Sequence, residues 1–199
     1  MQRKIKVSSD AKALIFDCDG TLVDSMPLHM RAWEEAFRKY NYKYEEEFLF
    51  SLKGMKEIEI IKLYNKRFHT NLDLEMLVKA KHVIFLNHIN QVKPIEPILN
   101  IALSYHKKLP LAIVSGSVHE IVYGELKTVG ILHLFRSIIT ADDPINPKPE
   151  PETFLETSKR LKVNPEDCIV FEDGDSGLEA AVKAGMKTID VRDYVDQTL

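Results

Sequence analysis

The sequence predicts an α/β protein with a Rossmann-like parallel-sheet core and a small helical domain inserted into it. Three observations predict this class. Short apolar segments alternate with helical patterns after residue 93, an isolated apolar run of the same kind lies near the N-terminus, and the segment between these regions has helical patterns only. Strands that alternate with helices are typical of parallel sheets covered by helices on both faces.

The first strand is expected at Ala13–Phe16, an apolar run that is closed by aspartate and glycine. A helix is expected next, because Pro27 suits a first helical turn and Trp33, Phe37 and Tyr40 recur at helical spacing. Three helices are predicted in the inserted segment, at residues 28–40, 58–68 and 74–89.

The second half of the chain repeats a helix followed by a strand. The predicted helices cover residues 98–106, 118–129, 151–161 and 178–184, and the predicted strands cover 111–114, 137–140, 168–171 and 188–191. We therefore expect a core domain made of residues 1–25 and 93–199 and a helical domain made of residues 26–92. The two connecting segments, 25–26 and 92–97, are expected to act as a hinge.

Composition narrows the class of protein. The 199 residues are 45% hydrophobic and 29% charged, which suits a folded domain with a real core. The net charge of −3 argues against a nucleic-acid partner. Cys18 and Cys168 predict reduced thiols rather than a disulfide framework. No apolar segment has the length of a signal peptide or a membrane span, so we expect a cytoplasmic protein, with a monomer as the default state.

Charged and hydroxyl side chains gather where the predicted strands end. In a parallel sheet these carboxyl ends share one edge, where ligands bind. The groups that follow the strands are Asp17 and Asp19, then Ser115 to Ser117, then Asp142, Asp143 and Lys148, and finally Glu172, Asp173 and Asp175. We expect the four sets to form one acidic cluster beside a lysine and a hydroxyl.

Each of these residues has a simpler interpretation. A single aspartate after a strand usually caps a turn or a helix, and this is the preferred interpretation of Asp175 and Ser176. Lys148 lies between prolines and would then be a solvated loop residue. The number of carboxylates at the strand ends favours a functional site over separate caps, because so many carboxylates at one edge repel one another unless a cation neutralises them. Hard oxygen ligands of this kind suit Mg²⁺.

The same groups fit phosphoryl transfer. One carboxylate can attack phosphorus and form an aspartyl-phosphate, and a second can protonate the leaving oxygen and then activate water. A serine hydroxyl, backbone N–H groups and a lysine can hold the phosphoryl oxygens. Asp17 and Asp19 are close enough in the chain to share this work.

The chain resembles the haloacid dehalogenase superfamily of phosphotransferases over nearly its whole length. Four segments match the family motifs in order, each after a predicted strand: "DCDGTLVDS", "VSGS", "KPEP" and "FEDGDSG". One departure is Gly174, which stands where the family often has a serine.

The resemblance implies a role for each matching residue. Asp17 would be the nucleophile and Asp19 the general acid/base, and both would bind Mg²⁺, Asp19 through its backbone carbonyl. Asp173 would be a metal ligand, and Glu172 a ligand or the partner of one. The groups implied to bind the phosphoryl group are Ser115, Lys148 and the backbone N–H groups near Cys18, Asp19 and Gly116.

The inserted segment is similar to the helical cap of the β-phosphoglucomutase-like group within this superfamily. That likeness places His29 near the catalytic aspartates as a substrate-binding residue; the alternative is a histidine on a helix surface. Two basic groups of the mutases are absent, since Glu57 and Val118 stand at their positions.

We therefore predict a Mg²⁺-dependent phosphatase of a small phosphate ester, similar to the fructose-1-phosphate and 6-phosphogluconate phosphatases, with a sugar phosphate as substrate. The alternatives are a β-phosphoglucomutase and, in a different class, a receiver-like signalling module that carries a phosphorylated aspartate.

Overall fold

A computed structural model describes residues 5–195 and shows a five-stranded parallel sheet in the order β5-β4-β1-β6-β7. The predicted core domain also includes residues 1–4 and 196–199, which lie outside the described residues. The strands are β1 (Ala13–Phe16), β4 (Leu111–Val114), β5 (Ser137–Ile139), β6 (Cys168–Glu172) and β7 (Lys187–Asp190). The predicted fold class is confirmed, with the first strand of the chain at the centre of the sheet.

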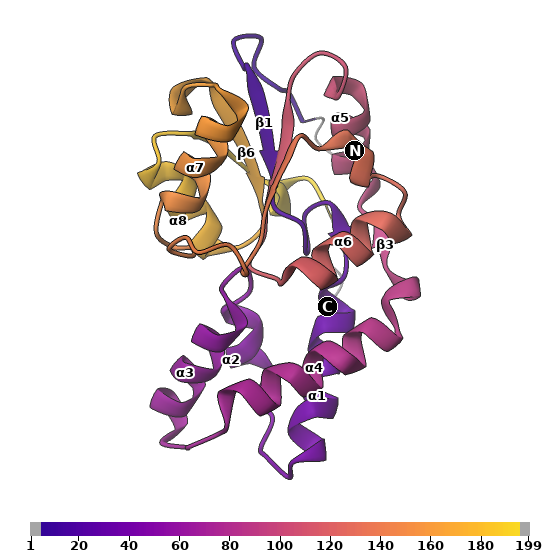
Figure 1. Cartoon of the computed structure of the whole chain (residues 1–199), viewed down its shortest axis with the longest axis vertical. Coiled ribbons are helices and arrows are strands. Elements are labelled where there is room, and N and C mark those ends of the chain that lie inside the picture. Colours follow the sequence, from indigo (N-terminus) through magenta and orange to yellow (C-terminus); the bar gives the residue numbers. More distant parts are fainter. Residues whose placement is uncertain (1–4, 196–199) are drawn as a thin grey trace.

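Helices cover both faces of the sheet (Figure 1). All four residues of β1 are buried, because successive side chains point to opposite faces. Leu14 and Phe16 belong to the apolar cluster on one face, and Ala13 and Ile15 to the cluster on the other. The first cluster includes residues of α5 (Glu96–Tyr105) and α6 (His119–Thr128), and the second includes residues of α7 (Glu152–Leu161) and α8 (Asp175–Lys183).

The helical segment forms a bundle at the end of the sheet where β1 and β6 terminate (Figure 1). Its helices are α1 (Met26–Lys39), α2 (Glu46–Ser51), α3 (Glu57–Phe68) and α4 (Leu74–Asn87). The bundle has an apolar cluster of its own, in which the rings of Phe37 and Tyr64 lie 5.1 Å apart. The three predicted helices are present, together with the short helix α2, which was not among them, whereas the division into a core and a cap domain stays a prediction.

A two-stranded ladder joins the two parts of the chain. Strand β2 (Val23–Asp24) precedes the bundle and pairs antiparallel with β3 (Lys93–Pro94), which follows it. The backbone N–H of Ile95 also donates to the carbonyl of Leu22 at 2.9 Å. The entry and exit of the bundle are therefore bonded to each other. Short 3₁₀ helices complete the described chain at Ile89–Gln91, Leu132–Leu134, Pro165–Asp167 and Val191–Asp193.

One boundary differs in a way that matters for the site. Helix α8 begins at Asp175, three residues before the predicted start, and Gly174 occupies its N-cap position. Asp175 and Ser176 therefore lie inside the first turn, so the prediction that one of them caps the helix is wrong. The carboxylate of Asp175 instead lies 2.8 Å from the guanidinium of Arg192.

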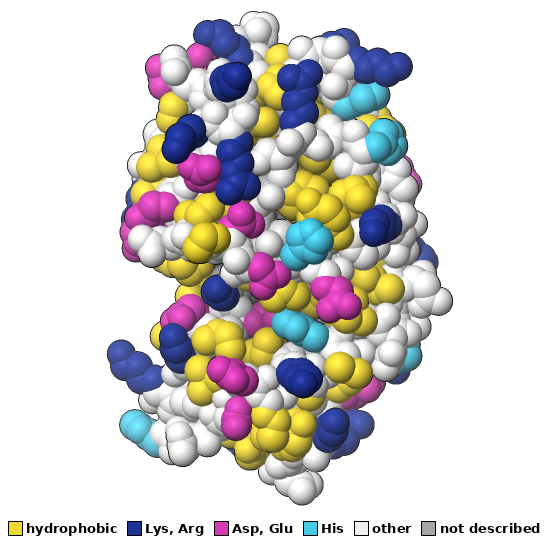
Figure 2. All heavy atoms as spheres, in the orientation of Figure 1, with side chains coloured by type: hydrophobic (Ala, Val, Ile, Leu, Met, Phe, Trp, Pro, Cys, Tyr) yellow, Lys and Arg dark blue, Asp and Glu magenta, His cyan; other side chains and the backbone are white. Residues whose placement is uncertain are grey.

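Positive and negative side chains are interspersed on the face shown in Figure 2, in keeping with the small net charge of −3. Across residues 5–195, no helix combines the length and the apolar character that a bilayer crossing requires.

The packing of β1 against β6 predicts a large stability effect. Phe16 is fully buried, and its ring stacks on that of Phe171 with the centroids 4.7 Å apart. Truncation to alanine leaves a cavity in the apolar cluster on this face of the sheet, so Phe16→Ala is expected to lower the free energy of unfolding by about 3–5 kcal/mol in chemical denaturation. Val182→Ala, at a position 63% exposed, is the control and is expected to change it by less than about 0.5 kcal/mol. A loss below about 1 kcal/mol for Phe16→Ala would contradict this packing.

Candidate active site

A buried lysine lies between two carboxylates at the ends of the central strands. The ammonium of Lys148 is 2.7 Å from Asp17 Oδ1 and 2.7 Å from Glu172 Oε2, and it donates to the carbonyl of Val114 at 3.0 Å. The segment between β5 and α7 supplies the lysine, while β1 and β6 supply the carboxylates. Lys148 is only 3% exposed, so its interpretation as a solvated loop residue is wrong.

The charges of this group support one another. Burial disfavours an ammonium, but Asp17 and Glu172 outweigh it and raise the pKa of Lys148. Burial, and then the charge of Glu172, raises the pKa of Asp17 well above its usual range. Burial also raises the pKa of Glu172. One ammonium cannot neutralise two ionised carboxylates, so the group would be stabilised by further positive charge.

Asp173 completes a set of three carboxylates that could hold a divalent cation. One oxygen from each of Asp17, Glu172 and Asp173 lies within 4.8 Å of the others, and all three residues are buried. Gly20, at a φ of +79°, leaves room for this group, because a Cβ there would lie 2.5 Å from Asp173 Oδ2. The donors are hard oxygens, so the residues present fit a cation such as those in phosphoryl-transfer sites.

The helical bundle adds a second lysine to this cluster. Lys53, in the loop between α2 and α3, places its ammonium 2.8 Å from Asp173 Oδ2. The same loop lies tightly against the core, since a Cβ on Gly116 would be 2.5 Å from the carbonyl oxygen of Gly54. Lys56 donates to the carbonyl of Ala141 at 2.7 Å. The bundle and the sheet are therefore in contact directly above the carboxylates.

The side chain of Asp19 lies apart from this cluster, among hydroxyl groups and an imidazole. Its oxygens accept hydrogen bonds from Ser25 Oγ at 2.7 Å, from Ser117 Oγ at 2.8 Å and from Ser115 Oγ at 3.3 Å. Burial alone would raise the pKa of Asp19, but His29 and then the hydrogen bond from Ser25 hold it below its usual range. Asp17 and Asp19 thus differ in environment as well as in position.

His29 connects Asp19 to a buried lysine of the bundle. Its Nε2 lies 2.6 Å from Asp19 Oδ1, and its Nδ1 lies 2.6 Å from the ammonium of Lys81. Since an ammonium can only donate, Nδ1 accepts and the ring proton lies on Nε2, which donates to Asp19. Burial, and then Lys81, lowers the pKa of His29, which favours this neutral form. His29 is 6% exposed, so the alternative of a surface histidine is wrong.

Lys81 is held in turn by Glu57, the first residue of α3. Glu57 Oε1 accepts from Lys81, and Glu57 Oε2 contacts His82 Nε2. Burial would raise the pKa of Glu57, but Lys81 and His82 lower it to about 2. The line of contacts from Asp19 through His29 and Lys81 therefore ends at an ionised carboxylate.

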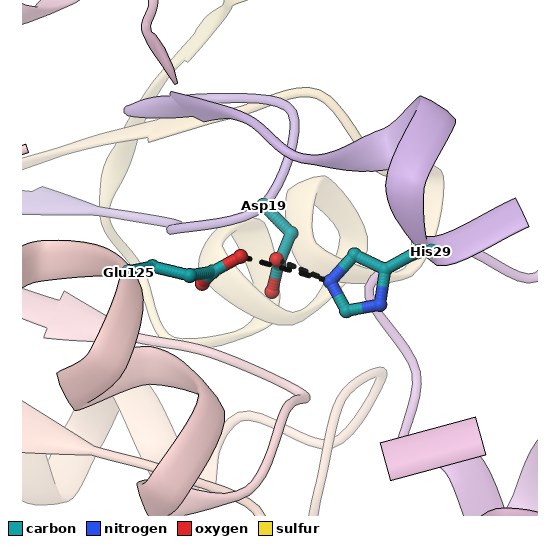
Figure 3. Close-up of side chains that lie close together, drawn as sticks. All are labelled: Asp19, His29 and Glu125. Atoms are coloured by element: carbon teal, nitrogen blue, oxygen red, sulfur yellow. Dashed lines mark hydrogen bonds and ion pairs between the residues drawn. The ribbon is translucent and has the colours of Figure 1, made fainter. Parts of the chain in front are cut away.

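Glu125 of α6 lies beside the pair formed by Asp19 and His29 (Figure 3). Its Oε1 is 3.8 Å from His29 Nε2 and has no hydrogen-bond partner among the described residues. Its Oε2 accepts from Cys18 Sγ at 3.5 Å. Burial, and then the charge of Asp19, raises the pKa of Glu125 well above its usual range. The proton on His29 Nε2 argues against a metal ion held by these three side chains.

A cavity of about 50 Å³ lies between the sheet and the bundle. Its walls contain Asp17, Asp19, Gly116 and Ser117 from the core and a set of bundle residues: Met26, His29, Met30, Trp33, Leu49, Lys53, Gly54, Met55, Glu57 and Ile60. This volume holds only a few water molecules, so we expect the two parts to separate when a larger ligand enters.

Three of the predicted acidic residues do not join the site. Asp142 accepts from the backbone N–H of His119 at 2.7 Å, and Asp143 accepts from that of Thr140 at 2.9 Å. Asp175 points to Arg192, as described above. For Asp142 and Asp143 the simpler interpretation, a backbone cap, is confirmed.

Sequence reasoning missed Lys81 and Glu125 as site residues. A signal was present, because each interrupts an apolar stripe of its helix: Lys81 follows Leu77 by four residues and precedes Phe85 by four. Glu125 lies on the buried side of α6 with Ile121 and Val122. A charged residue at such a position needs a buried partner.

The comparisons with known proteins agree with this geometry. A family model described as haloacid dehalogenase-like hydrolase matches residues 14–191. The chain is 36% identical over 182 residues to an uncharacterized protein of Haemophilus influenzae, covering 91% of each. It is 34% identical over 180 residues to the fructose-1-phosphate phosphatase YqaB of Escherichia coli, covering 90% of this chain and 95% of the relative.

A solved hydrolase from Pseudomonas syringae has the same fold, with a TM-score of 0.84 and 21% identity, over 93% of this chain and 87% of that one.

The unpartnered oxygen of Glu125 predicts a stabilising substitution. Glu125→Leu is expected to raise the free energy of unfolding by about 1–3 kcal/mol, because removal of the buried, unpartnered Oε1 outweighs loss of the weak 3.5 Å bond from Cys18 Sγ to Oε2. Glu120→Leu makes the same change at an exposed position of α6 and should shift it by less than about 1 kcal/mol. Chemical denaturation measures both, and a clear destabilisation by Glu125→Leu would mean that the carboxyl makes a net favourable bond.

Proposed function

The chain belongs to the haloacid dehalogenase-like hydrolase family, and from this premise we propose that it is a Mg²⁺-dependent phosphatase of sugar phosphates. The observation that carries the proposal is the separation of two aspartates into different environments. Asp17 lies with Lys148 in the carboxylate cluster, while Asp19 lies among proton donors. A nucleophile and a proton-transfer group need this division of surroundings.

In the proposed reaction, Asp17 attacks phosphorus and the bond to the leaving oxygen breaks. That oxygen takes a proton from Asp19, which leaves an aspartyl-phosphate and a free alcohol. Water then attacks the phosphorus, Asp19 takes its proton, and the bond to Asp17 breaks to release phosphate. The proton balance closes, because Asp19 ends protonated for the next cycle.

The two steps require different protonation states of Asp19. His29 and Ser25 favour the ionised form of Asp19, which suits the step that activates water. Protonating a leaving group requires Asp19 to carry a proton. Movement of α1 that withdraws His29 would remove the hydrogen bond from His29 Nε2, which lowers the pKa of Asp19, and so allow the proton to bind.

Asp17, Asp173 and the backbone carbonyl of Asp19 would hold the Mg²⁺. Glu172 is better placed as a partner than as a ligand, since its Oε2 contacts Lys148 and its Oε1 accepts from the N–H of Gly174 at 2.9 Å. The bound ion would neutralise the repulsion between these carboxylates and an incoming phosphate. Lys148, Ser115 and the N–H of Gly116 would hold the phosphoryl oxygens.

Residues 26–92 would act as a cap that closes over the substrate, with His29 among the substrate-binding residues. The cavity between this segment and the core, and the ladder of β2 and β3 at its base, support that role. A sugar phosphate is the proposed substrate because the chain is similar to a fructose-1-phosphate phosphatase. The reaction needs one copy of the chain, so the monomer stays our prediction.

The alternatives have less support. A β-phosphoglucomutase must grip a second phosphate, and the cavity wall carries the carboxylate of Glu57. A receiver-like module has no need for a helical segment that covers its acidic site.

The proposal predicts that Asp17→Asn abolishes turnover. With Mg²⁺, the wild type is expected to release phosphate from fructose 1-phosphate, and the variant should lose at least about a thousandfold in kcat because an amide is not a nucleophile here. EDTA should remove the wild-type activity. Asp142→Asn, outside the site, is the control. Conversion of β-glucose 1-phosphate to glucose 6-phosphate without free phosphate would instead support the mutase.

The contact between Lys53 and Asp173 predicts an effect on metal affinity. Mg²⁺ must compete with the ammonium of Lys53 for Asp173, so Lys53→Met is expected to bind Mg²⁺ about tenfold more tightly in the absence of phosphate. Calorimetric titration measures this without any substrate. Lys56→Met is the matched control, because Lys56 donates to a backbone carbonyl. Equal affinities of wild type and Lys53→Met would show that the lysine and the metal do not compete.

A further inference from the structure

We propose that Glu57 determines specificity, selecting phosphate esters whose leaving group is an uncharged polyol or sugar and rejecting those with a second negative charge. This inference rests on the proposed phosphatase function and names its substrate class. Glu57 takes no part in the chemistry described above; it would act on the part of the substrate that leaves.

Glu57 lies in the wall of the cavity that the substrate would enter. It lines the same cavity as Asp17 and Asp19, although it comes from the opposite wall, at the start of α3. A phosphate held next to Asp17 must direct its esterified group into the rest of this cavity, which the bundle closes. The leaving group would therefore meet the bundle wall, where Glu57 is the acidic residue that the cavity exposes.

The surroundings of Glu57 fix its carboxylate in place. Lys81 holds Oε1 and His82 contacts Oε2, so the group is tethered at both oxygens. Lys81 is fully buried, and its ammonium is also bound to His29 Nδ1 at 2.6 Å. The carboxylate cannot turn away from a repulsive ligand without breaking this set of contacts. With its pKa lowered to about 2, it remains ionised throughout the neutral range.

The basic partners lie behind the carboxylate as seen from the cavity. Neither Lys81 nor His82 lines it, whereas Glu57 does. Lys53 also lines the cavity, but its ammonium contacts Asp173 on the core side. Of the Glu57–Lys81 pair, the acidic residue and not the basic one therefore lines the cavity.

This arrangement discriminates by charge and by hydrogen bonding. An ionised carboxylate only accepts hydrogen bonds, and each oxygen of Glu57 retains a lone pair beyond its present contact, so sugar hydroxyls can donate to it. A second phosphate or a carboxylate at the same place would be repelled and could not donate. The ring of Trp33 and the methionine side chains in the wall offer an apolar surface to the carbon chain of a sugar.

A matched pair of substrates tests the inference directly. Glucitol 6-phosphate and 6-phosphogluconate have the same carbon chain and the same phosphate, and they differ at the far end, where one has a hydroxymethyl group and the other a carboxylate. The wild type is expected to show a kcat/KM at least about tenfold higher for glucitol 6-phosphate. Fructose 1-phosphate is assayed beside them to measure the phosphatase activity itself.

Two variants identify Glu57 as the cause. Glu57→Gln keeps the shape and removes the charge, so the ratio of the two kcat/KM values should fall towards one. Because this leaves the buried ammonium of Lys81 without its carboxylate, Glu57→Gln with Lys81→Met is the second variant, and it should lose the discrimination as well. Glu59→Gln is the matched control, since Glu59 lies on the same helix, is 40% exposed at its side chain and pairs with Lys62.

The outcomes separate the two proposals. Equal turnover of both substrates by the wild type, or a ratio that persists when Glu57 is replaced in either background, would overturn the specificity role while the phosphatase stands. Phosphate release from none of the three compounds would overturn the sugar phosphatase, and the specificity role with it. A wild-type preference that survives in Glu59→Gln and disappears in both Glu57 variants would support the inference.

Discussion

The site depends on one constraint: carboxylates that end two adjacent buried strands need positive charge. Lys148 meets part of this need by contacting Asp17 and Glu172 together, in a place where an unpaired ion would cost several kcal/mol. Because the lysine comes from a loop on the far side of β4, its bond also fixes that loop against the sheet. The chemistry and the folding of this edge therefore rest on the same ion pair.

The remaining positive charge comes from the ammonium of Lys53, which a metal cation could displace from Asp173. Asp173 faces Lys53, which the loop of the helical bundle carries, rather than a lysine of the sheet. Lys148 thus supplies positive charge from the core itself, whereas the charge of Lys53 is present only while the bundle lies against the core. Any ion that replaces Lys53 would change what holds the bundle against the core, so we expect metal binding to be coupled to the position of the bundle.

The sequence was informative wherever function sits at a fixed point of a regular element. Asp17, Ser115 and Asp173 each follow a strand of the sheet, and parallel strands bring their carboxyl ends together whatever the loops do. The same logic fails for Asp142, which also follows a strand but turns to cap the N-terminus of α6. Strand-end position identifies candidates, and only the path of the loop decides between a ligand and a cap.

The network of the bundle was beyond sequence reasoning for a different reason. Glu57 and Lys81 lie on separate helices, and their contact depends on how those helices pack. In the sequence Glu57 is a candidate for selecting the sugar and stands where the related mutases carry an arginine, but its partners cannot be identified there. The structure shows a carboxylate tethered at both oxygens on the wall opposite Asp17 and Asp19. A buried lysine and a half-buried histidine that hold one acid in place cost desolvation energy, and packing alone would be served as well by apolar side chains. The cost is explained if Lys81 and His82 serve to position the Glu57 carboxylate rather than to stabilise the fold.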